Sequence, residues 1–557
     1  MNLRFWKCGD SDWKNADERE RMIAARLEEA RAAKSTLDGY WRTMRTYYDG
    51  THETAKQTGA FLASMDLPWQ PCAVPDAYLH VEGQIEAIPP DFEFSARGDD
   101  DEQTALLRER AVRYVIQNND LTAKNAANER RLNLYGSAVW KLSVCENEIN
   151  EADIFIENPP LETIFPDPYA TAIDDCEYIA CIYRMNTERA ARIFKNDLEK
   201  RGLSMKSILA RKHRKGKDIF GLGDTVEIVE YWFRQPRDGE DTIEMLSGET
   251  VSYAYRSGDI ALSILIEGTE VRYLPKFWSK TDFPKYPFVI YTKIPREDCL
   301  WGKSEIEQII TLIDAADRQL AFAQLNTAFF SNDVLVYEEN AFSSDSYPEN
   351  RPGAIWKLRP GMMEKVKRLG GLAADHISHY EIADKYLAMM KEAVCNYYFM
   401  QGDSSTQVTT ATGLALLGDY ASKRMKAKNI CKKAGFERLY RLIDALVLEI
   451  YSAEKIQAIT DSVYSFDEFL SGKGYVPLID ICVNIGEGLE NSRSFTLTAL
   501  SDLCHMEITE ENYPIVRAYI NALGIPERAS LVAALDERFF QNKDEYVTEK
   551  GKEKQDE

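Results

Sequence analysis

A long helical segment without proline is the feature that most constrains the fold of this 557-residue chain. Between Gly413 and Glu454 apolar residues recur at helical spacing and no proline interrupts them. At 1.5 Å per residue this helix would span roughly 60 Å. Because that length exceeds the width of an ordinary domain core, the helix should brace a larger assembly or cross the molecule from one tier to another. Its apolar stripe comprises Leu414, Leu417, Met425, Phe436, Leu439, Leu442, Ile443, Leu446 and Ile450.

Two further helices are predicted shortly before the long one. Residues 301–454 read as helix, short β-rich insert, helix, polar loop and long helix, in that order. Pro295 excludes helix from the extended run that precedes the first of them, which ends near Phe330. The second runs from Ala373 to about Tyr398. Few soluble enzymes need such a layout.

The insert between these two helices, residues 332–371, contains two segments of strand character, DVLVYEEN and AIWKLRPG, followed by MMEKVKRLGG. Two short strands cannot bury much area alone. Either a neighbouring subunit completes the sheet by strand pairing, or the insert is a surface β-hairpin. The candidate intersubunit residues lie in these two strand segments: Val334, Val336, Ile355, Trp356 and Leu358.

The rest of the chain mixes helices and strands, so we predict an α+β fold. An amphipathic helix is expected from Asn15 to Met44 and a second helical stretch from Thr104 to Asn133. Strands follow, among them GSAVWKLSVCE and EADIFIEN, and more are expected over residues 224–290. Proline-rich connections should keep these from forming one regular sheet.

Four segments, taken in order, resemble tailed-bacteriophage portal proteins. They are ENPPLETIFPDPYATAIDDCEYIACIY with the following RMNTERAARIF, then EIVEYWFR, then YPFVIYTKIPREDCLWGKSEIEQIITLIDAADRQLAFA, and last TTATGLALLGDYASKRMKAK. The resemblance covers the chain from about Tyr40 to Ala522. No single motif is diagnostic in the way that a catalytic signature is; the order of the segments makes the resemblance specific.

The resemblance implies a multi-part portal fold with an α/β wing, a helical stem, a small α/β clip, a long bracing helix and a helical crown. The expected parts, by residue number, are 1–300 wing, 301–331 first stem helix, 332–371 clip, 372–399 second stem helix, 400–412 tunnel loop, 413–456 long wing helix, 457–491 wing strand return, 492–541 crown helices and 542–557 disordered tail.

The resemblance also implies a non-enzymatic ring subunit, expected as a dodecamer at the capsid vertex, through which double-stranded DNA is packaged and ejected. The implied partners are further copies of the chain, double-stranded DNA in transient and non-specific contact, the large terminase, the major capsid and scaffolding proteins, and a head-completion or adaptor protein. The expected location is the virion, after synthesis in the host cytoplasm. No cofactor, metal or membrane is expected.

The polar loop before the long helix is the candidate DNA-channel segment. It has no Lys, Arg or aromatic residue, which a loop that binds phosphates or stacks on bases would be expected to carry. Its hydroxyls and amides suit transient contacts with a moving duplex, although a simple linker between helices would read the same way. The candidate residues are Gly402, Asp403, Ser404, Ser405, Thr406, Gln407, Thr409 and Thr410.

The start of the long helix carries a cluster of basic residues. Their spacing spreads them around the helix, so they form either a solvated face with ion pairs to acidic surfaces or a DNA-facing belt. The candidates for a belt are Lys423, Arg424, Lys426 and Lys428, and Lys432 and Lys433 follow them.

Charge bears on how the chain meets DNA. With 68 basic and 90 acidic residues, the formal charge is 68 − 90 = −22. Wrapping DNA by counterion release needs many Lys and Arg side chains presented to phosphates. A channel wall past which DNA slides should instead repel phosphates, and acidic side chains would do so. Many cytoplasmic proteins, however, are acidic for other reasons.

Ten scattered cysteines without a CxxC pair are typical of reduced thiols. No apolar run reaches transmembrane length, and MNLRFWKCGDSDWKNADERE lacks the hydrophobic core of a signal peptide. We therefore expect a soluble protein made inside the cell.

No catalytic motif is evident. The chain lacks the GxxxxGK[ST] phosphate loop that a packaging ATPase needs, so it is not the motor, and it lacks a nucleophile elbow or HExxH helix. His376 and His379 lie one turn apart but have no third metal ligand nearby. Two alternatives stay open: another ring-forming connector, although such adaptors are usually much smaller chains, and a metal-dependent phosphodiesterase. The second would use the carboxylates of Asp167, Asp174, Asp175 and Glu177, which otherwise cap a strand end.

Overall fold

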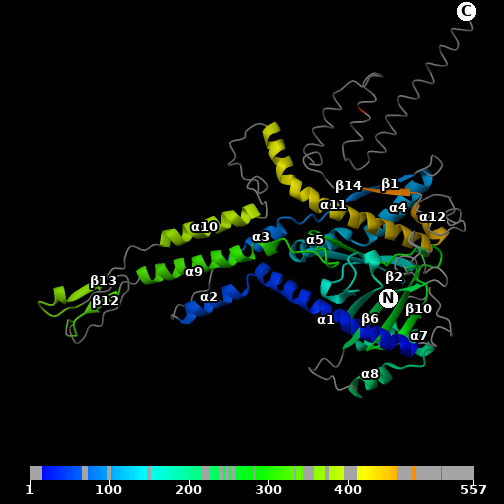
Figure 1. The fold of residues 1–557 in the computed structure, drawn as a ribbon, viewed down its shortest axis with the longest axis horizontal. Coiled ribbons are helices and arrows are strands. Elements are labelled where there is room, and N and C mark those ends of the chain that lie inside the picture. The colour runs from blue at the N-terminus through cyan, green and yellow to red at the C-terminus, as the bar shows by residue number, and fades with distance from the viewer. Residues whose placement is uncertain are drawn as a thin grey trace, which may run out of the picture.

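The computed structural model describes residues 16–64, 73–96, 102–146, 152–214, 225–236, 243–244, 250–251, 258–281, 283–331, 334–339, 341–342, 357–369, 376–393, 411–460, 479–484 and 516. Over these residues the chain mixes helices and sheets, which confirms the predicted α+β class. A body of sheets and helices carries a long projection made of two helices with a small β-structure at its tip (Figure 1).

The largest sheet of the body has five antiparallel strands in the order β10-β9-β6-β5-β4. Its strands are β4 (Ile164–Pro166), β5 (Tyr178–Asn186), β6 (Thr225–Pro236), β9 (Gly258–Ile266) and β10 (Thr269–Leu274). Side chains alternate across the sheet: Tyr178 and Ala180 enter a small core under the first helix, whereas Ile179 enters the main core. The sheet therefore separates two hydrophobic clusters.

Helix α1 (Ala16–Tyr48) covers one face of this sheet and extends past the predicted end at Met44. Ile23 and Leu27 point into the small core. Three arginines at its rim bind carboxylates of the sheet region, in the pairs Arg19–Glu270, Arg26–Glu177 and Arg31–Glu227. The arginine-rich polar face thus helps to hold α1 on the sheet.

A second sheet of three strands has the order β11-β2-β3. Its strands are β2 (Ser137–Glu146), β3 (Ala152–Glu157) and β11 (Phe288–Thr292). Because β11 lies here and β6, β9 and β10 lie in the five-stranded sheet, the strands over residues 224–290 do not form one regular sheet, as predicted. A two-residue pair, β7 (Ile243–Glu244) with β8 (Thr250–Val251), stands apart.

The helical stretch predicted over Thr104–Asn133 is two helices, α4 (Glu102–Asn118) and α5 (Leu121–Tyr135). Asp120 between them has φ +47°, a left-handed conformation that ends one helix and redirects the chain into the next. The buried Asn119 amide donates to the carbonyls of Val115 and Ile154. The predicted helical stretch is therefore confirmed, but as two helices instead of one.

The predicted long helix is confirmed as α11 (Ala411–Ile450), 40 residues, followed by α12 (Ala453–Thr460). It crosses the body beside the three-stranded sheet (Figure 1). Gly435 lets it approach β11 closely, since a Cβ there would lie 2.8 Å from the Tyr291 ring. Strand β14 (Ile479–Asn484), in the extended run expected after this helix, pairs antiparallel with β1 (Asp91–Ala96).

The projection begins at η5 (Ile306–Gln308) and α9 (Ile310–Ser331), and α10 (His376–Ala393) returns beside α9 (Figure 1). At its tip β12 (Val334–Tyr337) pairs with β13 (Val366–Leu369). The two helices are confirmed: α9 and α10 both lie within the spans predicted for them, residues 301–331 and 372–399. The expected second strand, AIWKLRPG, does not pair with β12 in the described residues: Leu358 forms only an isolated bridge with Phe342.

The remaining described elements are short. They are α2 (Glu53–Ser64), α3 (Asp76–Glu82), η3 (Leu161–Thr163), η4 (Ile173–Asp175), α6 (Thr187–Ile193), α7 (Lys195–Lys200), α8 (Met205–Arg214) and η6 (Met363–Lys365). Of these, α2 lies along α9 at the base of the projection (Figure 1).

Candidate assembly and DNA-channel regions

The projection joins the body where the loop Trp301–Gly302–Lys303–Ser304 crosses the start of β2. Gly136 has φ +79°, and a Cβ there would lie 2.2 Å from the carbonyl oxygen of Lys303. In return, a Cβ on Gly302 would lie 2.3 Å from the carbonyl oxygen of Gly136. The Gly302 N–H donates to Ser137 Oγ at 2.9 Å. Only glycine fits on either side of this crossing, which explains the local sequences YGSAVW and LWGKSE.

A buried polar network lies behind the crossing. Lys293 forms an ion pair with Glu305 and donates to Gln84 Oε1 at 2.8 Å and to Asn133 Oδ1 at 3.1 Å. The second Glu305 oxygen lies 3.0 Å from His80 Nε2. Charges that share several hydrogen bonds in a buried site hold a single geometry, because moving any member leaves the others unsatisfied. The network therefore fixes the direction in which the chain leaves the body toward α9.

A second anchor joins α9 to the turn between α1 and α2. The buried carboxylate of Asp317 lies 2.8 Å from His52 Nε2 and accepts the Val74 N–H at 2.9 Å. The ring of Tyr47 stacks on His52, and its hydroxyl donates to Asp314 on the same helix at 3.1 Å. Asp317 thus ties two separate segments of the chain, at His52 and at Val74, to the base of α9.

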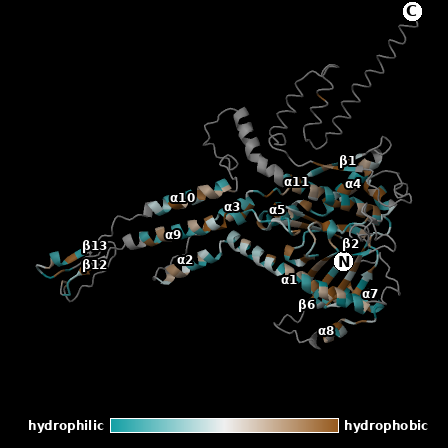
Figure 2. Ribbon diagram, in the orientation of Figure 1, coloured by the Kyte–Doolittle hydropathy of each residue, from teal (hydrophilic) through white to brown (hydrophobic). Residues whose placement is uncertain are grey.

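Hydrophobic residues recur along α9 and α10 (Figure 2), and several of their side chains are exposed. Phe322 on α9 is 48 % exposed, and Tyr380 and Met389 on α10 are 44 % and 50 % exposed. His379 does not face open solvent as part of a metal pair: its Nδ1 lies 2.8 Å from Gln319 Oε1. The side chain of His376 lies outside the described residues. An isolated pair of helices with uncovered apolar side chains is typical of a surface that packs against other chains.

The candidate residues at the tip are only partly described. Val336 and the neighbouring Tyr337 are about half exposed, and Tyr337 packs edge-on against Phe342. Val334 lies in β12, but its side chain is outside the described residues, as are Ile355 and Trp356 altogether. Leu358 forms the bridge to Phe342. Within the described residues the small sheet at the tip has two strands, so its outer edges are open to pairing.

The candidate DNA-channel residues lie outside the part of the chain that the structure describes. This holds for Gly402, Asp403, Ser404, Ser405, Thr406, Gln407, Thr409 and Thr410. The belt candidates Lys423, Arg424, Lys426 and Lys428 lie in α11, but their side chains are outside the described residues.

Lys432, the next basic residue along α11, is described and is not solvated. It is 1 % exposed and forms ion pairs with Glu86 at 2.8 Å and with Glu129 at 3.1 Å. Helical spacing alone could not reveal this, because both carboxylates come from segments far away in the sequence. Lys432 instead joins α11 to α5 and to the segment before β1.

The acidic group considered as a magnesium site is engaged otherwise. Asp174 pairs with Arg438 of α11 at 2.6 Å and with Lys285 at 2.9 Å. Burial alone would raise the pKa of Asp174, but the two cations outweigh it and hold that pKa below its usual value. Asp167 accepts the N–H groups of Tyr169 and Glu177, while the Glu177 carboxylate pairs with Arg26.

These carboxylates therefore hold the loop between β4 and β5 to α1 and α11, and Asp175 ends η4 beside them. Among the described residues no group of three or more His, Cys, Asp and Glu side chains is placed to hold a metal ion. Within the same residues no helix is long and apolar enough to cross a membrane.

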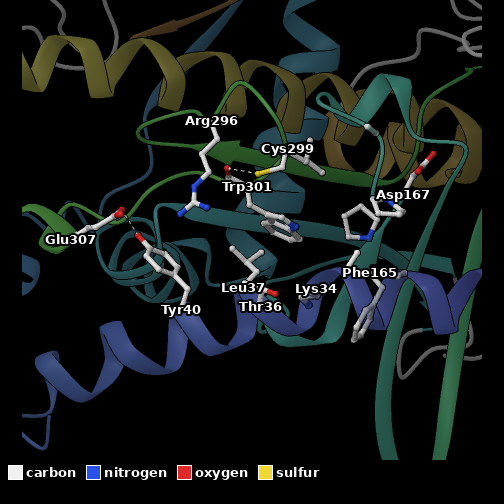
Figure 3. A pocket seen from close by; sticks show the side chains of 16 residues that line it. Lys34, Thr36, Leu37, Tyr40, Phe165, Asp167, Arg296, Cys299, Trp301 and Glu307 are labelled. Carbon is white, nitrogen blue, oxygen red and sulfur yellow. Dashed lines mark hydrogen bonds between the residues drawn. The ribbon is translucent and has the colours of Figure 1, made fainter. Parts of the chain in front are cut away.

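A cavity of about 430 Å³ lies between α1, the loop after β4 and the loop that leads to Trp301 (Figure 3). Its walls are mainly apolar and include Leu37, Phe165 and Trp301. Tyr40 donates to Glu307 at 2.8 Å on one side of it. Sequence reasoning missed this cavity, since its walls come from three segments that no periodicity connects.

Lys34 contributes a buried cation to the cavity wall. Its Nζ donates to the carbonyls of Leu161 and Ile164, both at 2.6 Å, and lies 4.2 Å from the centre of the Phe165 ring. Burial lowers the pKa of Lys34 to about 8, against the opposing effect of the Asp38 and Glu162 carboxylates. The cation is thus already matched by oxygen and ring electrons of its own chain.

Comparison with known proteins supports the resemblance seen in the sequence. A search of curated proteins found no significant match. The model of the phage P22-like portal protein family matches residues 73–267. This stretch contains four of the five strands of the largest sheet (β4, β5, β6 and β9), the strands β2 and β3, and two of the four segments that carried the resemblance. The match confirms the resemblance to tailed-bacteriophage portal proteins and supports the identification of this chain as a portal protein.

Proposed function

We propose that this chain is the portal subunit of a tailed bacteriophage, which forms a closed ring at one capsid vertex and lets double-stranded DNA pass during packaging and ejection. The family match over residues 73–267 carries the proposal. The long helical projection with a small β-tip supports it, because a projection with uncovered apolar side chains needs neighbours to bury them. By family resemblance the ring is a dodecamer.

We assign the parts of the portal accordingly. In this proposal α9 and α10 form the stem, residues 332–371 the clip, and residues 1–300 the main part of the wing, braced by α11 and rejoined by β14. Residues 400–412 line the channel as the tunnel loop, and residues 492–541 form the crown. The open edges of β12 and β13 suit strand addition from a neighbouring subunit.

The partners follow from the place of such a ring in the virion. The clip is the docking surface for the large terminase during packaging and for a head-completion or adaptor protein afterwards. The wing and crown meet the major capsid and scaffolding proteins. The chain itself serves as a conduit and not as an enzyme.

Imaging of the purified protein tests the proposal. Negative-stain micrographs should show rings with a central channel, and native mass spectrometry should give a species near twelve times 63.6 kDa or an adjacent integer. A chain that stays monomeric at micromolar concentration in several buffers would contradict it.

A further inference from the structure

Arg296, in the cavity beside Lys34, is a cation without a hydrogen-bond or ion-pair partner among the described residues. Arg296 lines the cavity with its guanidinium 4.9 Å from the centre of the Tyr40 ring. Its Nε is buried and has no hydrogen-bond partner within the described residues, and no ion pair is formed there either. Lys34, by contrast, donates to two carbonyls. A guanidinium with free donors that faces an apolar cavity is suited to receive a carboxylate.

The walls narrow the chemistry of the ligand further. The Trp301 indole lies between Arg296 and Phe165, and Leu37 faces it from α1 (Figure 3). These surfaces favour an apolar side chain next to the carboxylate. The volume of about 430 Å³ holds a few side chains and not a folded domain.

A nucleic-acid phosphate fits the site less well. The rim also carries the carboxylates of Glu307 and Asp167, which repel negative charge. A single carboxylate bound to Arg296 can keep its distance from both, whereas a polyanion would extend past them. The cavity is also lined mainly by aromatic and apolar side chains, whereas phosphate-binding surfaces present several cations to solvent.

We infer that this cavity is a socket for an acidic and apolar pair of side chains from a second copy of the chain. The inference rests on the proposed ring and names a contact within it. The chain itself displays the complementary chemistry on its surface. Tyr380 on α10 is 44 % exposed beside Glu381, whose carboxylate has no ion-pair partner among the described residues.

Photo-crosslinking in assembled rings tests the socket directly. Leu37, which lines the cavity, is replaced by p-benzoylphenylalanine, and Thr43, exposed on the same helix and outside the cavity, receives the same substitution as a control. Irradiation should link two chains through position 37, at several times the yield from position 43. The attached peptide should contain Asp or Glu next to an apolar residue. Rings that form normally but give no link between chains from position 37 would overturn the inference.

A charge-neutralising pair gives a second measurement that does not depend on the probe. Arg296→Gln should raise the protein concentration needed for half-assembly about tenfold, whereas Lys303→Gln, which neutralises an exposed cation nearby, should leave it unchanged. Circular dichroism checks that both variants fold. If Arg296→Gln weakens binding to linear duplex and leaves assembly intact, the cavity takes phosphate and the inference is wrong. If the unaltered protein never forms rings, the proposed function fails as well.

Discussion

At Gly136 and Gly302 two backbones cross with no room for a side chain, and this contact sets the base of the whole projection. Gly136→Ala would add a strained left-handed residue and a Cβ that overlaps the Lys303 carbonyl. We expect it to lower the free energy of unfolding by about 3–5 kcal/mol. Gly268→Ala is the matched control, because Gly268 has nearly the same φ, +78°, with open space around it. It should cost about 1–2 kcal/mol, for the conformation alone.

Thermal or urea unfolding of the purified variants measures this difference. Equal losses from Gly136→Ala and Gly268→Ala would mean that the crossing can relax, and that the close approach is not what holds the projection.

Because burial lowers the pKa of Lys34, the free energy of unfolding should depend on pH above about pH 8. The folded protein releases this proton near pH 8, whereas an unfolded lysine keeps it to about pH 10.4. Between these values the unfolded state binds more protons, so stability rises with pH; below pH 8 the burial penalty is constant. The difference in unfolding free energy between the unaltered protein and Lys34→Met should rise by about 2 kcal/mol from pH 8 to pH 10. Parallel curves across this range would show that the two carbonyls keep Lys34 protonated.

At the scale of elements, a single side chain of α11, Glu449, holds a whole loop of the body to this helix. The Glu449 carboxylate accepts the N–H groups of Ser279, Lys280 and Thr281 and the hydroxyls of the first and last. Glu449→Gln replaces one acceptor oxygen by an amide that faces these donors. We expect a loss of about 2–4 kcal/mol in unfolding free energy.

Glu454→Gln, on the exposed surface of α12, is the control for that change and should stay within about 0.5 kcal/mol. Similar results for both variants would mean that the loop over residues 279–281 is held by its neighbours and not by α11.

The tunnel loop before α11 remains a prediction from the sequence. If Ser404, Ser405 and Thr406 face DNA, replacing them with lysine should leave ring formation nearly intact and impair packaging, because each added phosphate contact favours binding. A complementation assay that scores filled heads, run beside imaging of the variant rings, measures both effects. Normal yields of filled heads would place the channel elsewhere along the chain.

Hydrophobic periodicity predicted α9, α10 and α11 because each helix carries its own local signal. The break at Asp120 was missed because a single residue in the left-handed conformation leaves that pattern almost unchanged. The partner of β12 was missed for a different reason. Strand pairing is a non-local choice, and the four residues Val366–Leu369 carry a weaker strand signal than AIWKLRPG.

The candidate functional regions show the same contrast between local sequence signals and contacts made by distant segments. The resemblance suggests which segments form the channel and the clip, and these assignments stay predictions. The buried ion pairs of Lys432 and the cavity at Arg296, by contrast, depend on contacts between segments distant in sequence. No spacing rule within one helix can supply such contacts.

At the scale of the whole molecule, the charge of −22 predicts how the ring meets DNA. We expect assembled rings to bind linear duplex weakly and without sequence preference, since an acidic wall repels phosphates. Electrophoretic mobility or fluorescence anisotropy at physiological salt measures this. Nanomolar, sequence-specific binding under those conditions would contradict an acidic channel.

The anchor at Asp317 has a mechanical consequence. Because this carboxylate binds both His52 and the Val74 N–H, the turn between α1 and α2 cannot stay in place if α9 tilts. Helix α1 continues from that turn across the five-stranded sheet, where arginine–carboxylate pairs clamp it. Helices α9 and α1 therefore act as a bent lever with its pivot at His52. A force applied at the tip of the projection is transmitted through this lever as torque on the five-stranded sheet.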